Sequence, residues 1–202
     1  MARTVDPERH RERRLAIIDA ALTCFARAGF ERTTTAAICR AAGIGSGTFF
    51  HYFPTKLDLL TAIIDLGTAE TREWFAAQSG RDDALAVVLD YVDHAADEAR
   101  DDRVAGFVLA VGGVMTVPEV ATVLEADERA IHDGLLPWVE AARTAGQIRQ
   151  DWPTEQSLQW LLLLLNGFLE RIAATPAFSA REQSAALRET TERVLGVRNP
   201  PR

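Results

Sequence analysis

The sequence is short of the residues that build metal centres, disulfide frameworks and membrane spans. Its 202 residues include only two cysteines, four histidines and one lysine, Lys56. Neither the cysteines nor the histidines have structural-zinc spacing. Cys24 and Cys39 lie beside apolar residues, which favours buried reduced thiols over a redox switch. The longest strongly apolar run, Trp160 to Leu165, is far below the roughly 18 residues of a membrane-spanning helix.

Two further patterns are missing, a secretory leader and a β-strand repeat. The first fourteen residues are rich in charge, and no apolar core with a cleavage site follows them, so we expect no signal peptide. Apolar residues nowhere alternate convincingly at period two, which predicts an all-α protein without a sheet. Together with the missing membrane span, these absences predict a soluble cytoplasmic protein.

The charge is unevenly distributed along the chain. The net charge is −7, which alone argues against a general nucleic-acid binder. Residues 1–56, however, hold nine basic and five acidic side chains, a net +4, whereas the remainder carries −11. A basic N-terminal segment beside an acidic body is typical of a localised DNA contact. A chance imbalance on the surface is the alternative.

The most informative segment is residues 33–56, TTTAAICRAAGIGSGTFFHYFPTK. Its first half is small or apolar, as a short and closely packed helix requires. Gly43-Ile44-Gly45 interrupts that helix, because glycine adopts left-handed dihedrals readily. A second short segment with hydroxyl and aromatic side chains, 46–53, ends before Pro54. A helix, a glycine turn and a second short helix are typical of a helix-turn-helix DNA-binding motif.

At these positions the chain resembles the tetracycline-repressor (TetR) family of DNA-binding regulators. The similarity rests on several short motifs in the right order and spacing: Gly29-Phe30, Thr33-Thr34-Thr35, Ile38, Ala42-Gly43-Ile44, Gly47-Thr48-Phe49-Phe50, His51-Tyr52-Phe53 and Lys56. It is confined to the N-terminal part of the chain, and beyond residue 70 only size and helical content agree. The resemblance implies a helix-turn-helix domain over residues 1–56, with its motif at 34–53. It also implies a helical effector-binding and dimerisation domain over 57–202.

The resemblance also assigns DNA contacts to individual residues. They are Thr33, Thr34, Thr35, Ser46, Gly47, Thr48, Phe50, His51, Tyr52 and Lys56. One threonine should cap the preceding helix while another offers its hydroxyl to a phosphate. For Phe50 the alternative is a place in the core, where we expect Phe49 and Phe53, and for Lys56 it is a solvated surface charge.

Three departures from the family pattern affect the DNA-facing segment. The family usually has serine in place of Gly45, lysine or arginine in place of Ser46, and tyrosine in place of Phe50. Gly45 weakens the expected N-cap, a role that Ser46 takes over in our prediction. The base preference of the family therefore cannot be transferred. An arm containing Arg3, Arg9 and Arg13 can compensate through phosphates or the minor groove, or be disordered.

Periodicity and capping residues predict about nine helices. Outside the motif, the expected helices cover residues 7–28, 55–78, 82–99, 103–115, 118–145, 154–174 and 180–195. Thr55 and Ser179 are candidate N-caps, and the latter begins a capping box. Pro137 should kink or divide the helix over 118–145.

The helix over residues 154–174 is apolar on more than one face, which predicts a dimer. A helix that is apolar all round must be buried all round, and a second copy can cover the side that the body leaves open. The TetR resemblance likewise implies a homodimer through the last two helices, and such dimers read two half-sites. The expected interface residues are Leu158, Leu161, Leu162, Leu165 and Leu169. Burial entirely within one chain is the alternative.

The acidic C-terminal body is the candidate effector domain. Several aromatic or polar side chains on different predicted helices can converge around a cavity for a small lipophilic ligand, namely Trp74, Tyr91, Phe107, Met115, Trp138, Trp160 and Asn166. Ordinary core packing is the alternative for each aromatic. A cluster of acidic residues with His94, within 93–101, can hold a cation but is more typical of a solvated face.

These observations predict a homodimeric transcription regulator without a cofactor or metal. We expect a repressor that binds a pseudo-palindromic duplex and is released by a lipophilic effector. An all-α enzyme or ligand carrier that uses the body cavity is the alternative. No nucleophile–base pair, metal-spaced histidine cluster or phosphate loop in the sequence supports that alternative.

Overall fold

The protein folds entirely into helices and loops within residues 7–197, the part that the computed structural model describes. The predicted all-α class is confirmed there. Arg3 of the predicted arm lies outside the described residues. Nine helices occupy this span: α1 (Pro7–Arg32), α2 (Thr35–Ala41), α3 (Ser46–Tyr52), α4 (Lys56–Ala77), α5 (Ala84–Glu98), α6 (Val104–Gly112), α7 (Pro118–Thr144), α8 (Thr154–Ala174) and α9 (Ala180–Leu195).

Local signals in the sequence explain the turns among the first four helices. Gly29 has φ 77° and ψ 166°, which interrupts α1 before its last residues. Thr34 caps α2 by accepting a hydrogen bond from the Ala37 amide. Gly43, with φ 63°, turns the chain from α2 toward α3. Thr55 caps α4 through a reciprocal capping box with Asp58, as predicted for Thr55.

The N-terminal core is shared by helices far apart in the sequence. Phe25 of α1, Ile38 of α2 and Phe49 of α3 are fully buried together with Leu59 and Leu60 of α4. The segment around α6 and the start of α7 also contribute side chains to this core. The first half of α4 therefore packs as part of the N-terminal unit, while its far end reaches into the body.

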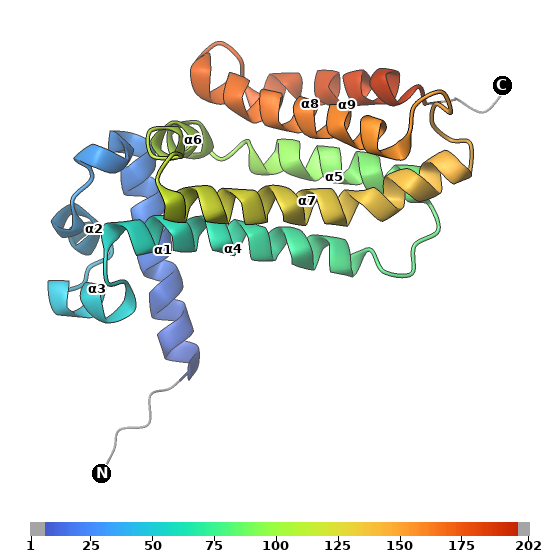
Figure 1. Ribbon diagram of the computed structural model, residues 1–202. Coiled ribbons are helices and arrows are strands. Elements are labelled where there is room, and N and C mark those ends of the chain that lie inside the picture. The colour runs from blue at the N-terminus through green and yellow to red at the C-terminus, as the bar shows by residue number, and fades with distance from the viewer. Residues whose placement is uncertain (1–6, 198–202) are drawn as a thin grey trace.

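The body is a stack of helices beside the N-terminal unit (Figure 1). The long helices α4 and α7 run side by side, α5 packs on α7, and α8 and α9 form an outer layer above them. The core of the body lies between these layers and includes Leu135 of α7 with Leu158 and Leu161 of α8. No helix within residues 7–197 is both long and apolar enough to cross a membrane.

Two local predictions were wrong, and a third is narrowed. Helix α7 continues through Pro137 as one helix, so the predicted division does not occur there, and the alternative of a kink stays a prediction. Helix α6 ends at Gly112, three residues before the predicted end, where Gly112-Gly113 weakens the last turn. Gly45, not Ser46, is the N-cap of α3, and no side chain caps this helix.

The body meets the N-terminal unit most closely where α6 crosses α1. A methyl group added at Gly106 would lie 2.1 Å from the carbonyl oxygen of Ala26, so only glycine permits this approach. At the start of α6, Arg103 bonds to Asp19 of α1 at 2.6 Å and to Asp101 at 2.7 Å. This crossing ties the start of the body to the first helix.

Candidate nucleic-acid interface

Helix α3 has one face in the core and one face open to solvent. Phe49 and Phe53, which closes α3, are buried as predicted. Phe50 is 52% exposed, which removes the core alternative for this ring. His51 is exposed as well, and Thr48 and Tyr52 are half-buried. Ser46 and Gly47 are also exposed, so all the predicted contact residues of α3 remain accessible.

The three adjacent threonines before and within α2 have three different environments. Thr34 is exposed and caps the helix, and Thr35 is half-buried at its first position. Thr33 is buried, and its hydroxyl donates to the carbonyl oxygens of Gly29 at 2.7 Å and Cys24 at 3.1 Å. Thr33 therefore braces the turn at the end of α1, and its hydroxyl is not presented to a phosphate.

Lys56 is a second predicted contact residue with a structural role. Its ammonium donates to the carbonyl oxygens of Phe30 at 2.7 Å and Thr33 at 2.9 Å. It also lies 4.2 Å from the centre of the Phe30 ring, a cation–π distance. Lys56 thus joins the start of α4 to the end of α1. It is neither a solvated surface charge nor, in this conformation, a side chain extended toward a phosphate.

Residues of α1 extend the surface of α3. The His10 ring stacks on Tyr52, with 4.6 Å between ring centres, and the Arg14 guanidinium lies 5.2 Å from the centre of the Phe53 ring. Neither residue was predicted from the sequence as a contact. The available signal was their spacing of four on the first helix, which places an imidazole and a guanidinium on one face.

The structure corrects the predicted interface on α8. Leu158, Leu161, Leu162 and Leu165 are buried within a single chain, and Leu169 is partly buried against the same core. Leu158, Leu161, Leu162 and Leu165 are therefore largely inaccessible to a second copy, whereas Leu169 keeps an exposed part. The exposed stripe lies on another side of the helix and includes Trp160 and Leu163, the latter 57% exposed. Because leucines lie on nearly every side of this helix, the sequence did not indicate which face is buried.

The predicted effector residues do not converge on one cavity. Trp74 packs against Tyr91, with ring centres 5.1 Å apart, whereas Phe107 packs against the N-terminal core. Trp138 is partly buried in the body core, and Met115 is 55% exposed. Trp160 and Asn166 border one hollow in the described part of the chain, and the other five side chains do not line it.

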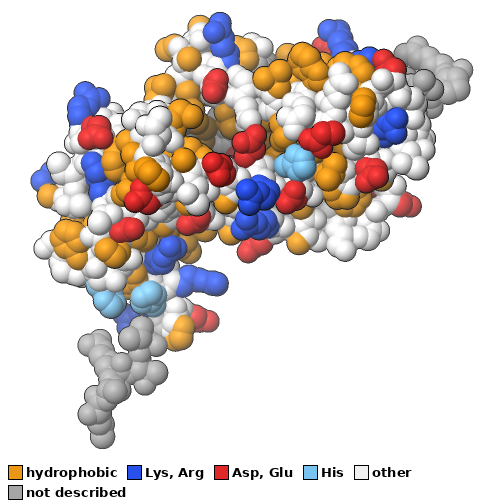
Figure 2. All heavy atoms as spheres, viewed as in Figure 1, with side chains coloured by type: hydrophobic (Ala, Val, Ile, Leu, Met, Phe, Trp, Pro, Cys, Tyr) orange, Lys and Arg blue, Asp and Glu red, His pale blue; other side chains and the backbone are white. Residues whose placement is uncertain are grey.

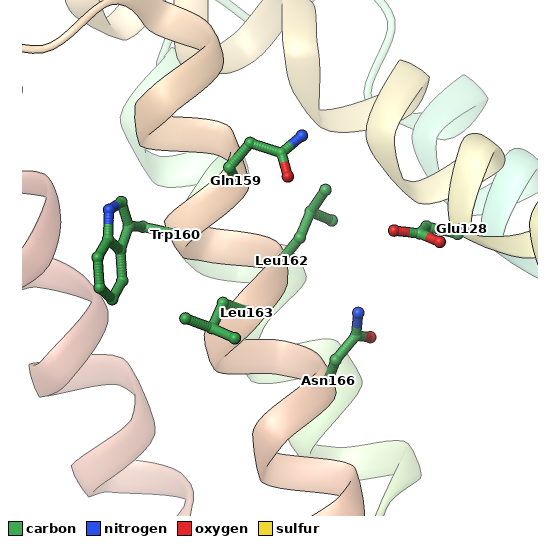
Figure 3. Close-up of a pocket in the computed structure, with 6 residues that line it drawn as sticks. All are labelled: Glu128, Gln159, Trp160, Leu162, Leu163 and Asn166. Carbon is green, nitrogen blue, oxygen red and sulfur yellow. The ribbon is translucent and has the colours of Figure 1, made fainter. Parts of the chain in front are cut away.

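That hollow has a volume of about 390 Å³ and lies between α7 and α8. Figure 3 shows Gln159, Leu162 and Asn166 on the side of α8 that faces Glu128 of α7, with Trp160 and Leu163 turned the other way. The side facing Glu128 therefore combines one leucine with two amide groups and one carboxylate, and small-molecule sites likewise place polar groups beside apolar ones. Glu128 and Gln159 were missed because surface polar residues of an amphipathic helix carry no distinguishing pattern.

A polar network lies deeper in the body, between α4 and α7. The Thr68 hydroxyl donates to the Asp127 carboxylate at 2.7 Å. Burial raises the pKa of Asp127 above its usual range, against the opposing effects of Thr68 and Arg72. Burial also raises the pKa of the nearby Tyr91 hydroxyl, although its hydrogen bond with Thr71 acts in the opposite direction. Burial therefore destabilises the ionised form of the Asp127 side chain.

The remaining candidate groups have ordinary partners. No group of histidine, cysteine and acidic side chains within residues 7–197 has the geometry to hold a metal ion. In the acidic stretch of α5 and its end, Asp93 pairs with Arg188, Asp97 with Arg100 and Glu98 with His94. Both cysteines are free thiols, and burial raises the pKa of Cys24.

Comparison with known proteins places this arrangement in a family context. The family model described as "Bacterial regulatory proteins, tetR family" matches residues 17–63, which include α2, α3 and the start of α4. The chain is 26% identical over 162 residues to the HTH-type transcriptional repressor AcnR of Corynebacterium diphtheriae, covering 80% of this chain and 82% of the relative. It is 28% identical over 173 residues to the HTH-type transcriptional regulator UidR of Escherichia coli, covering 86% and 87%.

Similarity among solved structures extends over nearly the whole chain. The structure of a SmeT–triclosan complex aligns with a TM-score of 0.76, covering 95% of this chain and 98% of SmeT. At 20% identity, this likeness concerns the fold alone. The two sequence relatives are a repressor and a regulator of transcription, and the surface of α3 lies within the matched N-terminal region.

Proposed function

We propose that this chain, which belongs to the TetR family of DNA-binding transcriptional regulators, is a repressor that a small lipophilic effector releases from its operator. The observation that carries the proposal is the two-sided α3. Phe49 and Phe53 anchor this helix in the core, while Phe50, His51 and Thr48 remain available to the major groove.

The proposed DNA contacts are a subset of those expected from the sequence. Thr48 and Phe50 are placed for base edges and thymine methyl groups, and His51 and Tyr52 for phosphates. Ser46, Gly47, Thr34 and Thr35 lie at the helix starts, where backbone amides approach the DNA backbone. Thr33 and Lys56 are not among the proposed contacts. Their side chains bond to backbone carbonyls at the end of α1 and so stabilise the surface that binds DNA.

We further propose a domain boundary between residues 56 and 57. Residues 1–56 form the DNA-binding domain and residues 57–202 the effector-binding and dimerisation domain, with α4 as the connection between them. Because one short recognition helix gives little specificity, two copies bind a pseudo-palindromic operator. The exposed stripe of α8 that contains Trp160 and Leu163 is the proposed contact between the copies. Operator binding would place the protein in the cytoplasm.

The proposed effector site is the hollow between α7 and α8. On the side of α8 that faces Glu128, Leu162 provides an apolar contact, and Asn166, Gln159 and Glu128 provide polar contacts. SmeT, which shares the fold, was crystallised as a complex with the lipophilic compound triclosan. Since α7 packs along α4, a ligand that displaces α7 also moves the connection to the DNA-binding domain. Such coupling is typically about 1–3 kcal/mol, or about 5–150-fold in operator affinity.

The central test is binding to a duplex selected by the protein from a random-sequence pool. Affinity should fall steeply as salt rises, because phosphate contacts release counterions. Thr48→Ala and Tyr52→Phe should each weaken binding, by about 1–3 kcal/mol where the contact is to a base. Thr144→Ala, on the exposed end of α7, is the matched control and should bind as the wild type does. Unchanged binding in both α3 variants would contradict the assigned surface.

The effector proposal has its own test. Triclosan and a panel of other hydrophobic compounds can be titrated into the protein–duplex complex while fluorescence anisotropy reports release. We expect at least one compound to release the duplex, and Asn166→Leu to alter the concentration required. If compounds that bind the body never change duplex affinity, the protein is a constitutive regulator instead.

A further inference from the structure

The DNA-facing surface contains an imidazole pair formed by two helices. His10 of α1 stacks on Tyr52 at 4.6 Å between ring centres, with 36° between the ring planes. His51 of α3 meets His10 edge-on, with ring centres 6.2 Å apart, and meets Tyr52 at 5.3 Å. His10 therefore extends the α3 surface onto the first helix.

The pair lies at the edge of the molecule that carries α3. In Figure 1 the N-terminal half of α1 runs past α3 and beyond the rest of the fold. In the same view, Figure 2 shows histidine side chains next to each other and to Lys or Arg side chains over this region. His51 is exposed and His10 is half-buried, so a phosphate can approach both rings.

We propose that His10 and His51 form a phosphate-binding imidazole pair and that operator binding takes up protons at this pair. The inference rests on the proposed binding of DNA through α3. A neutral imidazole has one donor and no charge, whereas an imidazolium has two donors and a positive charge. Histidine changes between these forms close to neutral pH, and a polyanion favours the charged one. His10 thus becomes a DNA-binding residue outside the helix-turn-helix motif.

Charged side chains of both signs lie near the pair along the chain. Along α1 the charged neighbours of His10 are Glu8, Arg9, Arg11, Glu12, Arg13 and Arg14, and on α3 the titratable side chains are His51 and Tyr52. On α4, Lys56 bonds to backbone carbonyls and Asp58 to Thr55. Two positive charges at the 6.2 Å separation of the His10 and His51 rings would repel each other, and a phosphate against both rings would offset that repulsion.

The size of the effect follows from proton linkage. For an imidazole of ordinary pKa, about 6.5, a tenfold preference of the duplex for the protonated form makes affinity fall about sixfold between pH 6 and pH 8. The remaining histidines, His94 and His132, lie on α5 and α7 of the body. They are therefore separate from the proposed pair, and His132 provides a control.

The test compares affinities for the selected duplex at pH 6 and pH 8 at one salt concentration. His10→Phe keeps a ring against Tyr52 but cannot take up a proton, so it should lose the sixfold contribution of one imidazole. His51→Gln should lose a similar contribution. His10→Lys carries a charge at both pH values, so it should bind well at pH 8 with a reduced pH dependence. His132→Gln should retain the wild-type pH dependence.

A direct measurement supplements the variants. Adding duplex to the wild-type protein at pH 7.5 should move the ring carbon–hydrogen NMR signals of His10 and His51 toward the protonated positions. Salt-sensitive binding that is equally tight at pH 6 and pH 8, or an unchanged pH dependence in both His10→Phe and His51→Gln, would overturn this inference alone. Failure to bind any duplex at either pH would instead contradict the proposed function.

Discussion

At the scale of single residues, several polar side chains of the recognition motif hold the fold together. Thr33 and Lys56 belong to a pattern typical of DNA contacts, yet both bond to backbone carbonyls at the end of α1. These carbonyls lie where Gly29 interrupts the helix, and that of Phe30 also accepts a hydrogen bond from the Thr33 amide. The motif therefore specifies the shape of the DNA-binding unit as well as its contacts.

Lys56 gives the first test of this structural role. Lys56→Gln removes a charged donor from the carbonyls of Phe30 and Thr33, and we expect the free energy of unfolding to fall by about 1.5–3 kcal/mol. Denaturant titration followed by circular dichroism measures the change. Arg40→Gln removes an exposed charge from the same domain and should leave stability nearly unchanged. Equal stabilities for both variants would contradict the structural role of Lys56.

Asp127 gives a prediction with a pH dependence. Burial raises its pKa in the folded state, so the ionised carboxylate lowers stability at neutral pH, and this penalty disappears as the pH falls through the folded pKa. Asp127→Asn keeps an acceptor for the Thr68 hydroxyl without the charge. We therefore expect a higher Tm for this variant at pH 7, and a gain that shrinks toward pH 4.

The neighbouring Glu125 provides the control for that prediction. It is exposed on the same helix, so Glu125→Gln should change Tm little at either pH. Thermal unfolding of the three proteins at several pH values makes the comparison. A lower Tm for Asp127→Asn at pH 7 would mean that the attraction between Asp127 and Arg72 outweighs the desolvation penalty.

At the scale of helices, boundaries were predictable where local chemistry determines them. Helix α8 covers the predicted residues 154–174, and Thr55 caps α4 through neighbours three positions away. The exposed face of α8 was not predictable, because the unbroken run Leu161 to Leu165 places leucines on every side of the helix. The cavity was also mispredicted, since which of Trp74, Phe107 and Trp138 meet depends on how the helices stack. Sequence pattern thus predicted the fold and the α3 surface better than the body site.

The crossing of α6 over α1 provides the prediction at this scale. Gly106→Ala places a methyl group 2.1 Å from the Ala26 carbonyl oxygen, a backbone atom that cannot rotate away. We expect a loss of about 1–3 kcal/mol in the free energy of unfolding, the usual cost of overpacking. Gly112→Ala in the same helix meets open space and should be neutral or stabilising by up to about 1 kcal/mol. Equal effects of the two substitutions would mean that α6 is not held against α1.

At the scale of the whole molecule, the proposed recognition of two half-sites would depend on where the outer layer of α8 and α9 directs its exposed residues. The α3 surface and the α8 stripe lie in different parts of the fold (Figure 1). A second copy docked on α8 therefore leaves both recognition helices accessible, and the distance between them becomes a property of the dimer. An effector that moves α7 can change that distance without touching DNA.

Substitutions at two adjacent leucines distinguish an effect on dimer assembly from an effect on folding. Leu163 is 57% exposed and Leu162 is 5% exposed, so a charge at Leu163 meets the proposed partner whereas a charge at Leu162 enters the core of its own chain. We expect the wild type to sediment as a dimer of about 44 kDa, twice the 22.2 kDa of the chain. Leu163→Glu should remain folded, sediment as a monomer and lose most of its affinity for a two-half-site duplex. Leu162→Glu should be unstable or insoluble, because it buries an unpaired charge. A Leu163→Glu protein that stays dimeric at micromolar concentration would place the contact between copies on another surface, and the spacing of the two recognition helices would then have to be derived from that surface.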